Sequence, residues 1–510
     1  MGRAAKPGAI ARQPLLLLLI GACAVSMLVP AAHAVVRDDH PTSQSFFYAG
    51  VLGMFFFTLV AIILSARQPR HGTMGQLLAL LAAFTILPAY LAVPFHDALK
   101  TTSFLNAYFE MVSAFTTTGA TLFDPPERLN ATLHLWRAQV GWMGGLLMWV
   151  AASAILAPLS LGGFEITARG EPGRPERAQI AVERADPQKR LARIAWTLVP
   201  IYAGLTAVLW VALLIAGDGA LVALCHAMSI MATSGISPVG GIEQDVAGLP
   251  GEAVMFLFML FALSRLTFSG DTVTAGDARL DRDPEFRAGL LLVFLVPLLL
   301  FLRHWLGAFE IAAGEDLGQG LRAFWGGLFT TLSFLTTTGF VSAEWDTAQD
   351  WSGLGTPGLI LMGLALIGGG VATTAGGVKL LRVYVLYRNG LREMERLMHP
   401  SSVGLETGGH RRIKRDGAFI AWIFFMLFAL SIAAVTVILA ALGVSFEDAI
   451  LLSVASLSTT GPLIGVAADE PIRLIELGTP AKLVLAAAMV LGRLETLAII
   501  ALLSADFWRR

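Results

Sequence analysis

Long apolar runs, separated by short polar segments, make up most of this chain. Runs of 18 or more predominantly apolar residues recur along it, and a helix of that length crosses a bilayer's hydrocarbon core of about 30 Å. We predict membrane-spanning helices over 15–36, 46–66, 74–95, 136–160, 194–216, 252–270, 286–306, 356–388, 416–441 and 480–504. The pattern therefore predicts an all-α polytopic membrane protein.

Four shorter apolar stretches lie between these runs, at about 103–118, 220–234, 324–338 and 446–460. Fifteen helical residues cover about 22 Å, which is too short to span the core comfortably. We therefore interpret the four stretches as re-entrant half-helices. The irregular backbone that follows each of them must be buried in protein or line water.

Each short stretch ends in a threonine, a second hydroxyl residue and a glycine. The four triplets are Thr117-Thr118-Gly119, Thr233-Ser234-Gly235, Thr337-Thr338-Gly339 and Thr459-Thr460-Gly461. Their spacing indicates four diverged copies of one unit, consisting of a helix, a half-helix, a turn and a second helix. We expect an N-terminal helix pair at 1–73 and repeats at 74–193, 194–285, 286–415 and 416–510.

The chemistry of backbone carbonyls explains why such a triplet would recur at membrane depth. A cation that has lost its water needs several oxygen ligands at once, and carbonyls supply them without a formal charge. Glycine lacks a Cβ atom and so adopts the conformations that aim consecutive carbonyls at one axis. The hydroxyls can pin the turn or add ligands. Four copies predict a pore that selects a small cation, whereas ordinary helix packing would explain a single triplet.

Composition excludes several other classes of protein. The 510 residues are 55% hydrophobic and 14% charged, against about one-quarter charged in soluble proteins. The two cysteines, Cys23 and Cys225, lie in apolar segments and offer neither a disulfide framework nor a metal site. The predicted spans hold no cluster of His, Asp and Glu of the kind that a membrane enzyme needs. We therefore expect no enzyme activity and no cofactor.

Charged residues are distributed unequally between alternate loops. Basic residues gather at 169–193, 279–287 and 388–415, which the positive-inside rule places in the cytoplasm. The segments after the triplets are acidic instead, with Asp124, Glu127, Glu243, Asp245, Glu344, Asp346, Asp350, Asp469 and Glu470. We expect the triplets to open to the outside through a negative mouth that concentrates cations; the alternative is that these loops are simply solvated.

The first 34 residues allow two interpretations. Arg3, Lys6 and Arg12 precede an apolar stretch from 15 to 30, and 32–34 reads Ala-His-Ala, like the cleavage site of a signal peptide. We favour a retained first helix over a cleaved signal peptide. Both interpretations place Val35 outside the cytoplasm.

A glycine-rich segment interrupts the predicted helix at 356–388. Residues 368–377 contain five glycines in ten positions, and each costs a helix about 1 kcal/mol relative to alanine. We expect this segment to unwind into a loop that plugs the pore, and close packing of small residues is the alternative. The expected gate comprises Gly369, Gly370, Gly376, Gly377, Lys379 as the cytoplasmic anchor of the loop, and Arg493.

Arg493 lies inside the last apolar run, where a charge is costly unless it faces a polar interior. At ~10 Å from a permeating cation and an effective dielectric constant of ~20, its repulsion amounts to ~1.7 kcal/mol. We expect an electrostatic barrier below the triplets; the alternative is a structural pair with Glu495 or another carboxylate. Arg137 and Arg265 are expected at interfaces or snorkelling toward them, and His226 is expected to be packed rather than catalytic.

Several longer motifs are specific enough to indicate a family. Residues 109–121 read Phe-Glu-Met-Val-Ser-Ala-Phe-Thr-Thr-Thr-Gly-Ala-Thr, and further motifs lie at 136–145, 368–379, 395–400, 492–495 and 507–509. Together they resemble the first filter, the following helix, the intramembrane gating loop and the last helix of the Trk/Ktr/HKT superfamily of potassium uptake proteins. The resemblance is strongest to the TrkH branch and covers essentially the whole chain.

The resemblance implies a subunit that takes up potassium across the inner (cytoplasmic) membrane, with potassium as its substrate. The twelve triplet residues would be the potassium-binding filter, arranged with fourfold pseudosymmetry. It also implies a homodimer and a cytoplasmic nucleotide-binding regulatory subunit of the TrkA type, with no nucleic acid as partner. The basic loops would receive that subunit or anionic membrane lipid.

Three positions depart from the family's usual pattern. The second filter reads Ser234-Gly235-Ile236 where two glycines usually precede a phenylalanine. Leu463 follows Gly461-Pro462 where a glycine is usual, and Ala372 replaces a glycine of the loop. A less selective conduit for sodium and potassium therefore stays an alternative. A carrier for an organic solute would instead predict broken helices around a single central site.

Overall fold

The computed structural model describes residues 13–65, 73–157, 187–243, 246–264, 280–307, 317–353, 355–399, 415–468 and 471–494. Within these ranges the chain forms helices and loops, without strands. Seven helical segments there are long and apolar enough to cross a membrane: Leu15–Val36, His40–Leu64, Gly75–Leu99, Ala131–Leu156, Arg190–Ala216, Pro284–His304 and Gly417–Ala441. The prediction of an all-α polytopic membrane protein is confirmed.

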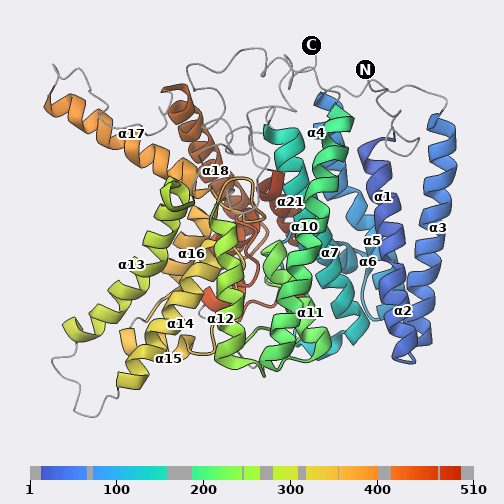
Figure 1. Cartoon of the computed structure of the whole chain (residues 1–510), viewed down its shortest axis with the longest axis horizontal. Helices are drawn as coiled ribbons and strands as arrows, with labels where there is room; N and C mark the ends of the chain where they lie inside the picture. Colours follow the sequence, from blue (N-terminus) through green and yellow to red (C-terminus); the bar gives the residue numbers. More distant parts are fainter. Residues whose placement is uncertain are drawn as a thin grey trace, which may run out of the picture.

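Five helices form the N-terminal side of the bundle (Figure 1). They are α1 (Leu15–Ser26), α2 (Leu28–Val36), α3 (His40–Ser65), α4 (Thr73–Thr85) and α5 (Leu87–Leu99). α1 and α2 make one span with an interruption at Met27, and both pack on α3. The predicted helix at 74–95 is likewise divided, because Pro88 lies in the first turn of α5 and proline lacks the N–H that a continuous helix needs.

Four helices end at the triplets: α6 (Phe104–Phe115), α11 (Ala220–Ala232), α14 (Leu317–Leu335) and α19 (Phe446–Leu457). α6 and α19 begin at serine caps, since the Ser103 and Ser445 hydroxyls accept the backbone N–H three residues later. α6, α11 and α19 have 12 or 13 residues, the length predicted for half-helices. α14 has 19 residues, because its more polar first turns around Arg322 precede the apolar stretch that hydropathy detects.

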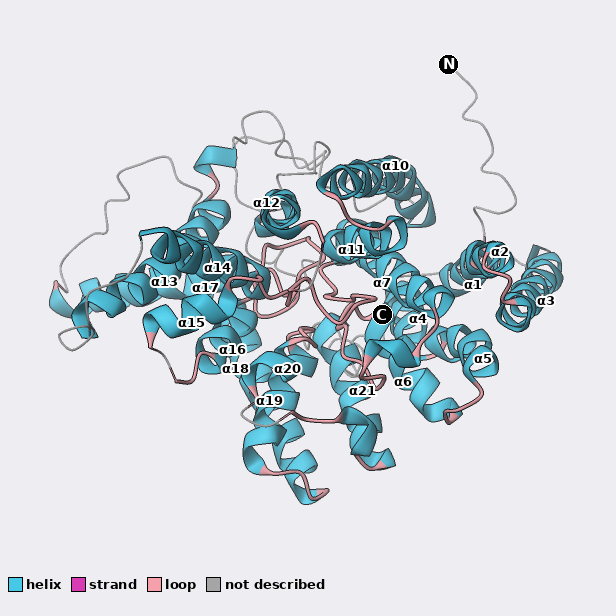
Figure 2. Cartoon of the chain, turned by 90° about the horizontal axis from the view of Figure 1, so that it is seen from below, coloured by secondary structure: helices cyan, strands magenta, loops and turns pink. Residues whose placement is uncertain are grey.

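Each of these four helices lies between two other helical segments. The preceding segments are α5, α10 (Pro187–Ala216), α13 (Pro284–Gly307) and α18 (Arg415–Ala441), and the following ones are α7 (Ala131–Ala151), α12 (Gly248–Met259), α16 (Gly358–Ile367) and α21 (Thr479–Leu494). Contacts also join successive groups: α11 contacts α7, α14 contacts α12, α19 contacts α16 and α6 contacts α21. The contacts close into a ring, which Figure 2 shows as helices around central loop segments.

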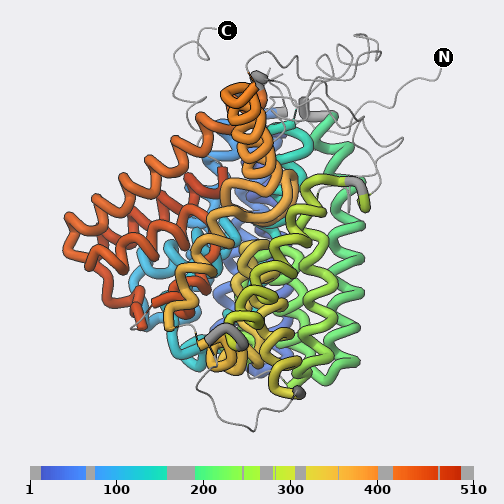
Figure 3. Tube along the Cα trace, turned by 90° about the vertical axis from the view of Figure 1, so that its left-hand side faces the viewer, coloured from blue at the N-terminus to red at the C-terminus, as the bar shows by residue number. Residues whose placement is uncertain are grey.

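Two predicted spans are not continuous helices. The span at 252–270 ends as a helix at Leu263 and continues into the extended Ser264, while 265–279 lies outside the described residues. The span at 356–388 contains α16, a non-helical segment at 368–379 and α17 (Leu380–Met398). The predicted break in this helix is confirmed. α17 then leaves the bundle at an angle (Figures 1 and 3).

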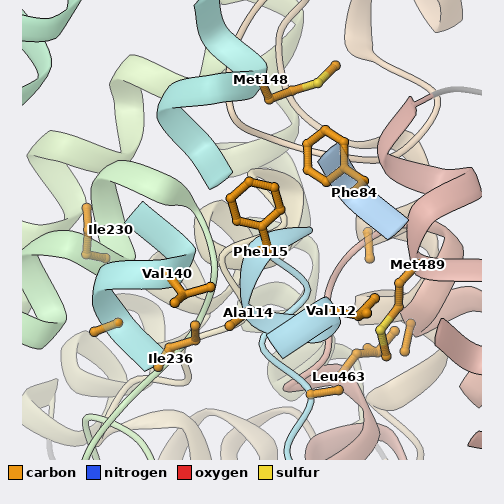
Figure 4. Packing of buried hydrophobic residues seen from close by; sticks show 14 of the residues in the cluster. Phe84, Val112, Ala114, Phe115, Val140, Met148, Ile230, Ile236, Leu463 and Met489 are labelled. Carbon is orange, nitrogen blue, oxygen red and sulfur yellow. The ribbon is translucent and has the colours of Figure 1, made fainter. Parts of the chain in front are cut away.

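Apolar side chains fill the space between the half-helices and the surrounding spans (Figure 4). Phe115 at the end of α6 points toward Phe84 of α4, with ring centroids 5.1 Å apart. Gly141 of α7 leaves room for Ile236, since a Cβ atom at Gly141 would lie 2.9 Å from the Ile236 side chain. This packing fixes the position at which the triplets begin.

Candidate functional site

The same backbone turn follows all four half-helices. The first threonine of each triplet has a positive φ, which is 56° at Thr117, 50° at Thr233, 57° at Thr337 and 56° at Thr459. In every copy its N–H bonds the carbonyl three residues earlier, and the next N–H bonds the carbonyl five residues earlier. This is a Schellman motif, in which glycine normally takes the left-handed position. A threonine there is strained by roughly 1–3 kcal/mol, so the surrounding packing must hold the turn.

The glycine of each triplet lies against the next copy of the turn. A Cβ atom built on Gly119 would lie 1.8 Å from the carbonyl oxygen of Ser234, and one built on Gly235 would lie 2.3 Å from that of Thr338. A Cβ atom on Gly339 would lie 3.0 Å from the Pro462 ring, and one on Gly461 would lie 2.6 Å from the carbonyl oxygen of Thr118. The Gly461 N–H also donates to that last oxygen at 2.6 Å. The four triplets therefore meet in a closed ring.

Hydroxyl groups brace the ring from within each copy. The second triplet residue bonds the hydroxyl of the residue before the triplet in three copies: Thr118 to Thr116 at 2.8 Å, Thr338 to Thr336 at 3.0 Å and Thr460 to Ser458 at 3.2 Å. The hydroxyls of Thr117 and Thr459 differ, because they are buried and have no hydrogen-bond partner among the residues that the structure describes. Oxygen atoms of this kind beside a ring of carbonyls are suited to bind a cation.

The non-helical segment at 368–379 lies against the ends of three half-helices. The Gly376 N–H donates to the Thr337 hydroxyl at 2.7 Å, and the Thr374 hydroxyl donates to the Met231 carbonyl at 3.3 Å. A Cβ atom on Gly376 would lie 2.1 Å from the Ser458 carbonyl oxygen. The whole segment is buried. It therefore fills the space next to the second, third and fourth triplets.

The predicted gate residues come together in this segment. Gly369, Gly370 and Gly377 are packed so closely that a Cβ atom would lie 2.6–2.7 Å from Ala375, Leu263 and Ala365 respectively. The buried Lys379 ammonium donates to the Ala375 carbonyl. Lys379 therefore bonds the loop itself.

Arg493 reaches the same segment from the last helix. Its side chain is 3% exposed, and Nη1 donates to the Thr374 carbonyl at 2.6 Å. The arginine thus bonds the backbone of the loop. Glu495, the expected alternative partner, lies outside the described residues.

The prediction for Arg137 is wrong. Arg137 is 3% exposed, and its Nε lies 2.6 Å from Oε1 of Glu110 on α6, which is 1% exposed. An arginine near the start of a span commonly snorkels to the interface, but here a carboxylate on a different helix compensates its burial. Arg265 lies outside the described residues. The prediction that His226 is packed is confirmed, because it is fully buried against Phe340 with ring centroids 5.5 Å apart.

Sequence reasoning missed three buried carboxylates around the site. Glu110 accepts the Leu122 N–H at 3.0 Å. Glu252 accepts three donors at 2.7 Å: the Trp325 ring N–H, the Ser342 hydroxyl and the Ala343 N–H. Glu285 accepts the Val371 N–H of the glycine-rich segment at 2.6 Å. For Glu110 the available signal was a glutamate inside an apolar run, which is costly in a membrane unless it is paired.

Acidic residues lie on the segments that follow the triplets, including α15 (Trp345–Ser352), which is at the lower end of the molecule in Figure 1. Desolvation and the negative charge of Asp346 raise the pKa of Glu243 above its usual value. These two carboxylates are therefore close enough for the charge on Asp346 to disfavour ionisation of Glu243. Asp245, Asp469 and Glu470 lie outside the described residues, as do the basic positions at 169–184, at 279 and at 411–414.

A family model described as TrkH, cation transport protein, matches residues 51–240 and 284–509. The chain is 29% identical to the Trk system potassium uptake protein TrkH of Vibrio parahaemolyticus, covering 96% of this chain and 98% of that protein. It is 28% identical to the protein of the same name from Escherichia coli, over 95% of this chain and 96% of that protein. The Halomonas elongata protein of that name is 31% identical over 79% of this chain and 80% of its own length.

A solved structure has the same fold. The crystal structure of the potassium transporter TrkH from Vibrio parahaemolyticus superimposes with a TM-score of 0.79 at 27% sequence identity. The match covers 98% of this chain and 99% of that one.

Proposed function

Because this chain belongs to the TrkH family of cation transport proteins, we propose that it takes up potassium across the cytoplasmic membrane through the ring of triplets. The observation that carries the proposal is the closed ring of glycine contacts, in which four turns of one geometry face each other. The relatives' description as potassium uptake proteins supports the choice of ion. The protein acts as a transporter and not as an enzyme.

In this proposal, carbonyl oxygens of the four triplets replace the water around a potassium ion. The hydroxyls of Thr117 and Thr459 are further ligands, since they are buried beside the ring without a partner among the described residues. The four half-helices direct their C-terminal ends toward the ring, and each end contributes about half a negative charge. The four units at 74–193, 194–285, 286–415 and 416–510 are then quasi-equivalent pore repeats around one path.

The segment at 368–379 and Arg493 form the gate. For an ion to pass, the segment must leave the half-helix ends, which breaks the Gly376–Thr337 and Thr374–Arg493 hydrogen bonds. The arginine adds a positive charge below the triplets, worth ~1.7 kcal/mol of repulsion at ~10 Å and an effective dielectric constant of ~20. Gly369, Gly370, Gly376, Gly377 and Lys379 shape the closed conformation of this segment.

The acidic segments after the triplets form the outer mouth. Their negative charge raises the local concentration of cations before entry into the ring. The membrane potential then drives inward movement, at about 2.3 kcal/mol per charge for each 100 mV.

The subunit assembles as a homodimer and is regulated by a cytoplasmic nucleotide-binding subunit of the TrkA type. The relatives' description as members of a Trk system supports a multi-component assembly. Size-exclusion chromatography with light scattering tests the dimer. Co-purification of a nucleotide-binding partner with the tagged chain tests the regulator.

Ion flux into proteoliposomes tests the proposed function. The purified chain should carry potassium along its gradient, protein-free liposomes should not, and Gly119→Ser should abolish the flux. The alternative is a conduit that admits sodium as well, favoured by Ile236 and Leu463 at positions where the family usually has other residues. Equal inhibition of rubidium uptake by potassium and sodium would support that alternative.

A further inference from the structure

The ninth residue before each triplet glycine shows a regular variation. These residues are Glu110, His226, Thr330 and Leu452, and all four are buried. Each lies on the half-helix of its own repeat, about two and a half helical turns of sequence before the glycine. Because the four sites are equivalent by sequence position, the side chains can be compared as natural variants of one site.

Three of these side chains bond the non-helical segment that leaves the triplet, which we call the outgoing segment. Glu110 accepts the Leu122 N–H at 3.0 Å, and Thr330 accepts the Ser342 N–H at 3.3 Å. Both amides belong to the third residue after the glycine. His226 bonds the Ser237 hydroxyl at 2.9 Å, two residues after its glycine. A polar side chain at this position therefore bonds the half-helix to the outgoing segment.

The fourth repeat has no such bond at this position. Leu452 is apolar, and the chain after Gly461 turns directly into the short helix α20 (Leu463–Ala467). Its Ile464 N–H bonds the Gly461 carbonyl at 3.0 Å within that turn. The wall of the ring formed by the fourth triplet is thus held by local helical bonds.

The first repeat has the strongest tie. The Glu110 carboxylate is held by Arg137 at 2.6 Å, with both side chains at most 4% exposed. A hydrogen bond to an ionised acceptor is roughly twice as strong as a neutral one. The Ser113 hydroxyl also donates to the Ala120 carbonyl at 2.6 Å, just after the glycine. The first outgoing segment is therefore held by hydrogen bonds at Ala120 and at Leu122.

The first and fourth walls are also neighbours in the ring. The Gly461 N–H donates to the Thr118 carbonyl at 2.6 Å. A movement of the first outgoing segment would therefore be transmitted to the fourth triplet, whose half-helix makes no such side-chain bond at Leu452.

We propose that Glu110, held by Arg137, is a positioning residue that fixes the first outgoing segment and so contributes to the preference for potassium over sodium. The inference rests on the proposed function. A sodium ion is smaller, so its binding requires the oxygen ligands to move inward. A segment held by a hydrogen bond to a carboxylate resists that movement. Potassium, which fits the ring without it, is therefore favoured.

Two double variants isolate the hydrogen bond between the side chain at position 110 and the Leu122 N–H. Glu110→Gln with Arg137→Met removes both charges but keeps an amide oxygen that can accept the Leu122 N–H. Glu110→Met with Arg137→Met also removes both charges, at similar volume, but leaves no acceptor. Removing the two partners together avoids an uncompensated buried charge, which would itself be strongly destabilising.

The measurement is rubidium uptake by the reconstituted full chain in competition with potassium and with sodium. The ratio of interest is the inhibition constant of sodium divided by that of potassium. We expect this ratio to stay within about twofold of the wild type in the glutamine double variant. We expect it to fall about tenfold in the methionine double variant, a difference of ~1.4 kcal/mol. Thr330→Val should lower the ratio less, because Glu252 also holds Ser342 and Ala343.

A merely structural role gives a different result. Both double variants would then lower the yield of folded protein and the uptake of both ions in proportion, with an unchanged ratio, and that outcome would overturn the inference. If the methionine variant is not recovered folded, Glu110→Leu with Arg137→Met replaces it, since leucine occupies this site in the fourth repeat. Absence of potassium flux in the wild type would contradict the proposed function itself.

Discussion

The first and fourth triplets begin alike and end differently. Thr117 and Thr459 both have a φ of 56°, with the same pair of hydrogen bonds back to the half-helix. After Gly119 the chain continues as a non-helical segment bonded to α6, whereas after Gly461 it turns into α20. The shared beginning follows from the triplet, and the different continuations follow from residues outside it.

Pro462 and Leu463 explain the turn in the fourth repeat. Proline has a φ suited to the start of a helix and lacks an N–H that an extended strand could donate. Leu463 is fully buried and belongs to the same apolar cluster as Val112 and Met489, which Figure 4 labels. The Pro462 ring also lies against Gly339, so this turn is part of the ring. The comparison teaches that the triplet sets the conformation of each turn, while the residues behind and after it set the stiffness of each wall.

The largest expected effect comes from the glycines, where the two repeats should behave alike. A Cβ atom would lie 1.8 Å from the Ser234 carbonyl oxygen on Gly119 and 2.1 Å from the Ala120 nitrogen on Gly461. Gly119→Ala and Gly461→Ala should each reduce potassium flux in proteoliposomes more than a hundredfold. Gly465→Ala is the matched control, since no atom lies within 4 Å of its Cβ position, and it should stay within twofold of the wild type. Normal flux in either ring variant would separate the two repeats at their beginning.

A second effect concerns Arg493 of α21, whose side chain bonds the segment at 368–379. Arg493→Ala removes the bond to Thr374 and a repulsion of ~1.7 kcal/mol, so we expect potassium flux to rise about tenfold. Arg493→Lys keeps the charge but not the planar donor geometry, and it should retain most of the barrier. Both are measured as initial rates of flux. An alanine variant with wild-type flux would remove the barrier from the mechanism.

A smaller effect distinguishes the two continuations directly. Leu463→Gly removes the buried side chain that favours α20 and should change the potassium-to-sodium ratio about threefold, because the fourth wall loses its local helix. Thr121→Gly is the equivalent change in the first repeat and should alter the ratio less than twofold, since Ala120 and Leu122 are tied on either side. Competition of each ion with rubidium uptake measures both. Equal effects would mean that the two walls do not differ in stiffness.

The smallest effect lies at the outer mouth. Glu243→Gln should lower flux about twofold at ~0.01 M salt and have little effect at ~0.15 M, where charges are screened within about 8 Å. The raised pKa of Glu243 means that its carboxylate takes up a proton above pH 4.5, the usual value for this group. Wild-type flux at low salt should therefore begin to fall above that pH as the medium is acidified, and the variant should lose this component. An identical pH profile in the variant would exclude the role of this charge.

The sequence predicts the fold class and the turns because both depend on local patterns. Apolar run length identifies the spans, and the short runs ending in a hydroxyl and a glycine identify the half-helices. The break at 368–379 follows from glycine density alone. The sequence does not predict the length of α14, because its polar first turns have no hydropathy signal.

Side-chain pairs between helices were beyond prediction. Arg137 and Glu110 lie on different helices, and neither residue alone indicates its partner. The same holds for Glu252, whose donors lie on Trp325, Ser342 and Ala343, and for Glu285, which bonds the segment at 368–379. These pairings depend on how the helices pack, within a repeat as well as between repeats, and a single sequence contains no direct signal of that packing.

An experimental structure with rubidium in place of potassium would test the shared role of the four triplets most directly. We expect anomalous density on the axis of the ring, within ligand distance of carbonyl oxygens from Thr118, Ser234, Thr338 and Thr460, and its loss in Gly119→Ala. Density bound to one repeat alone, or located away from the triplets in a protein that still transports potassium, would contradict a filter built from all four.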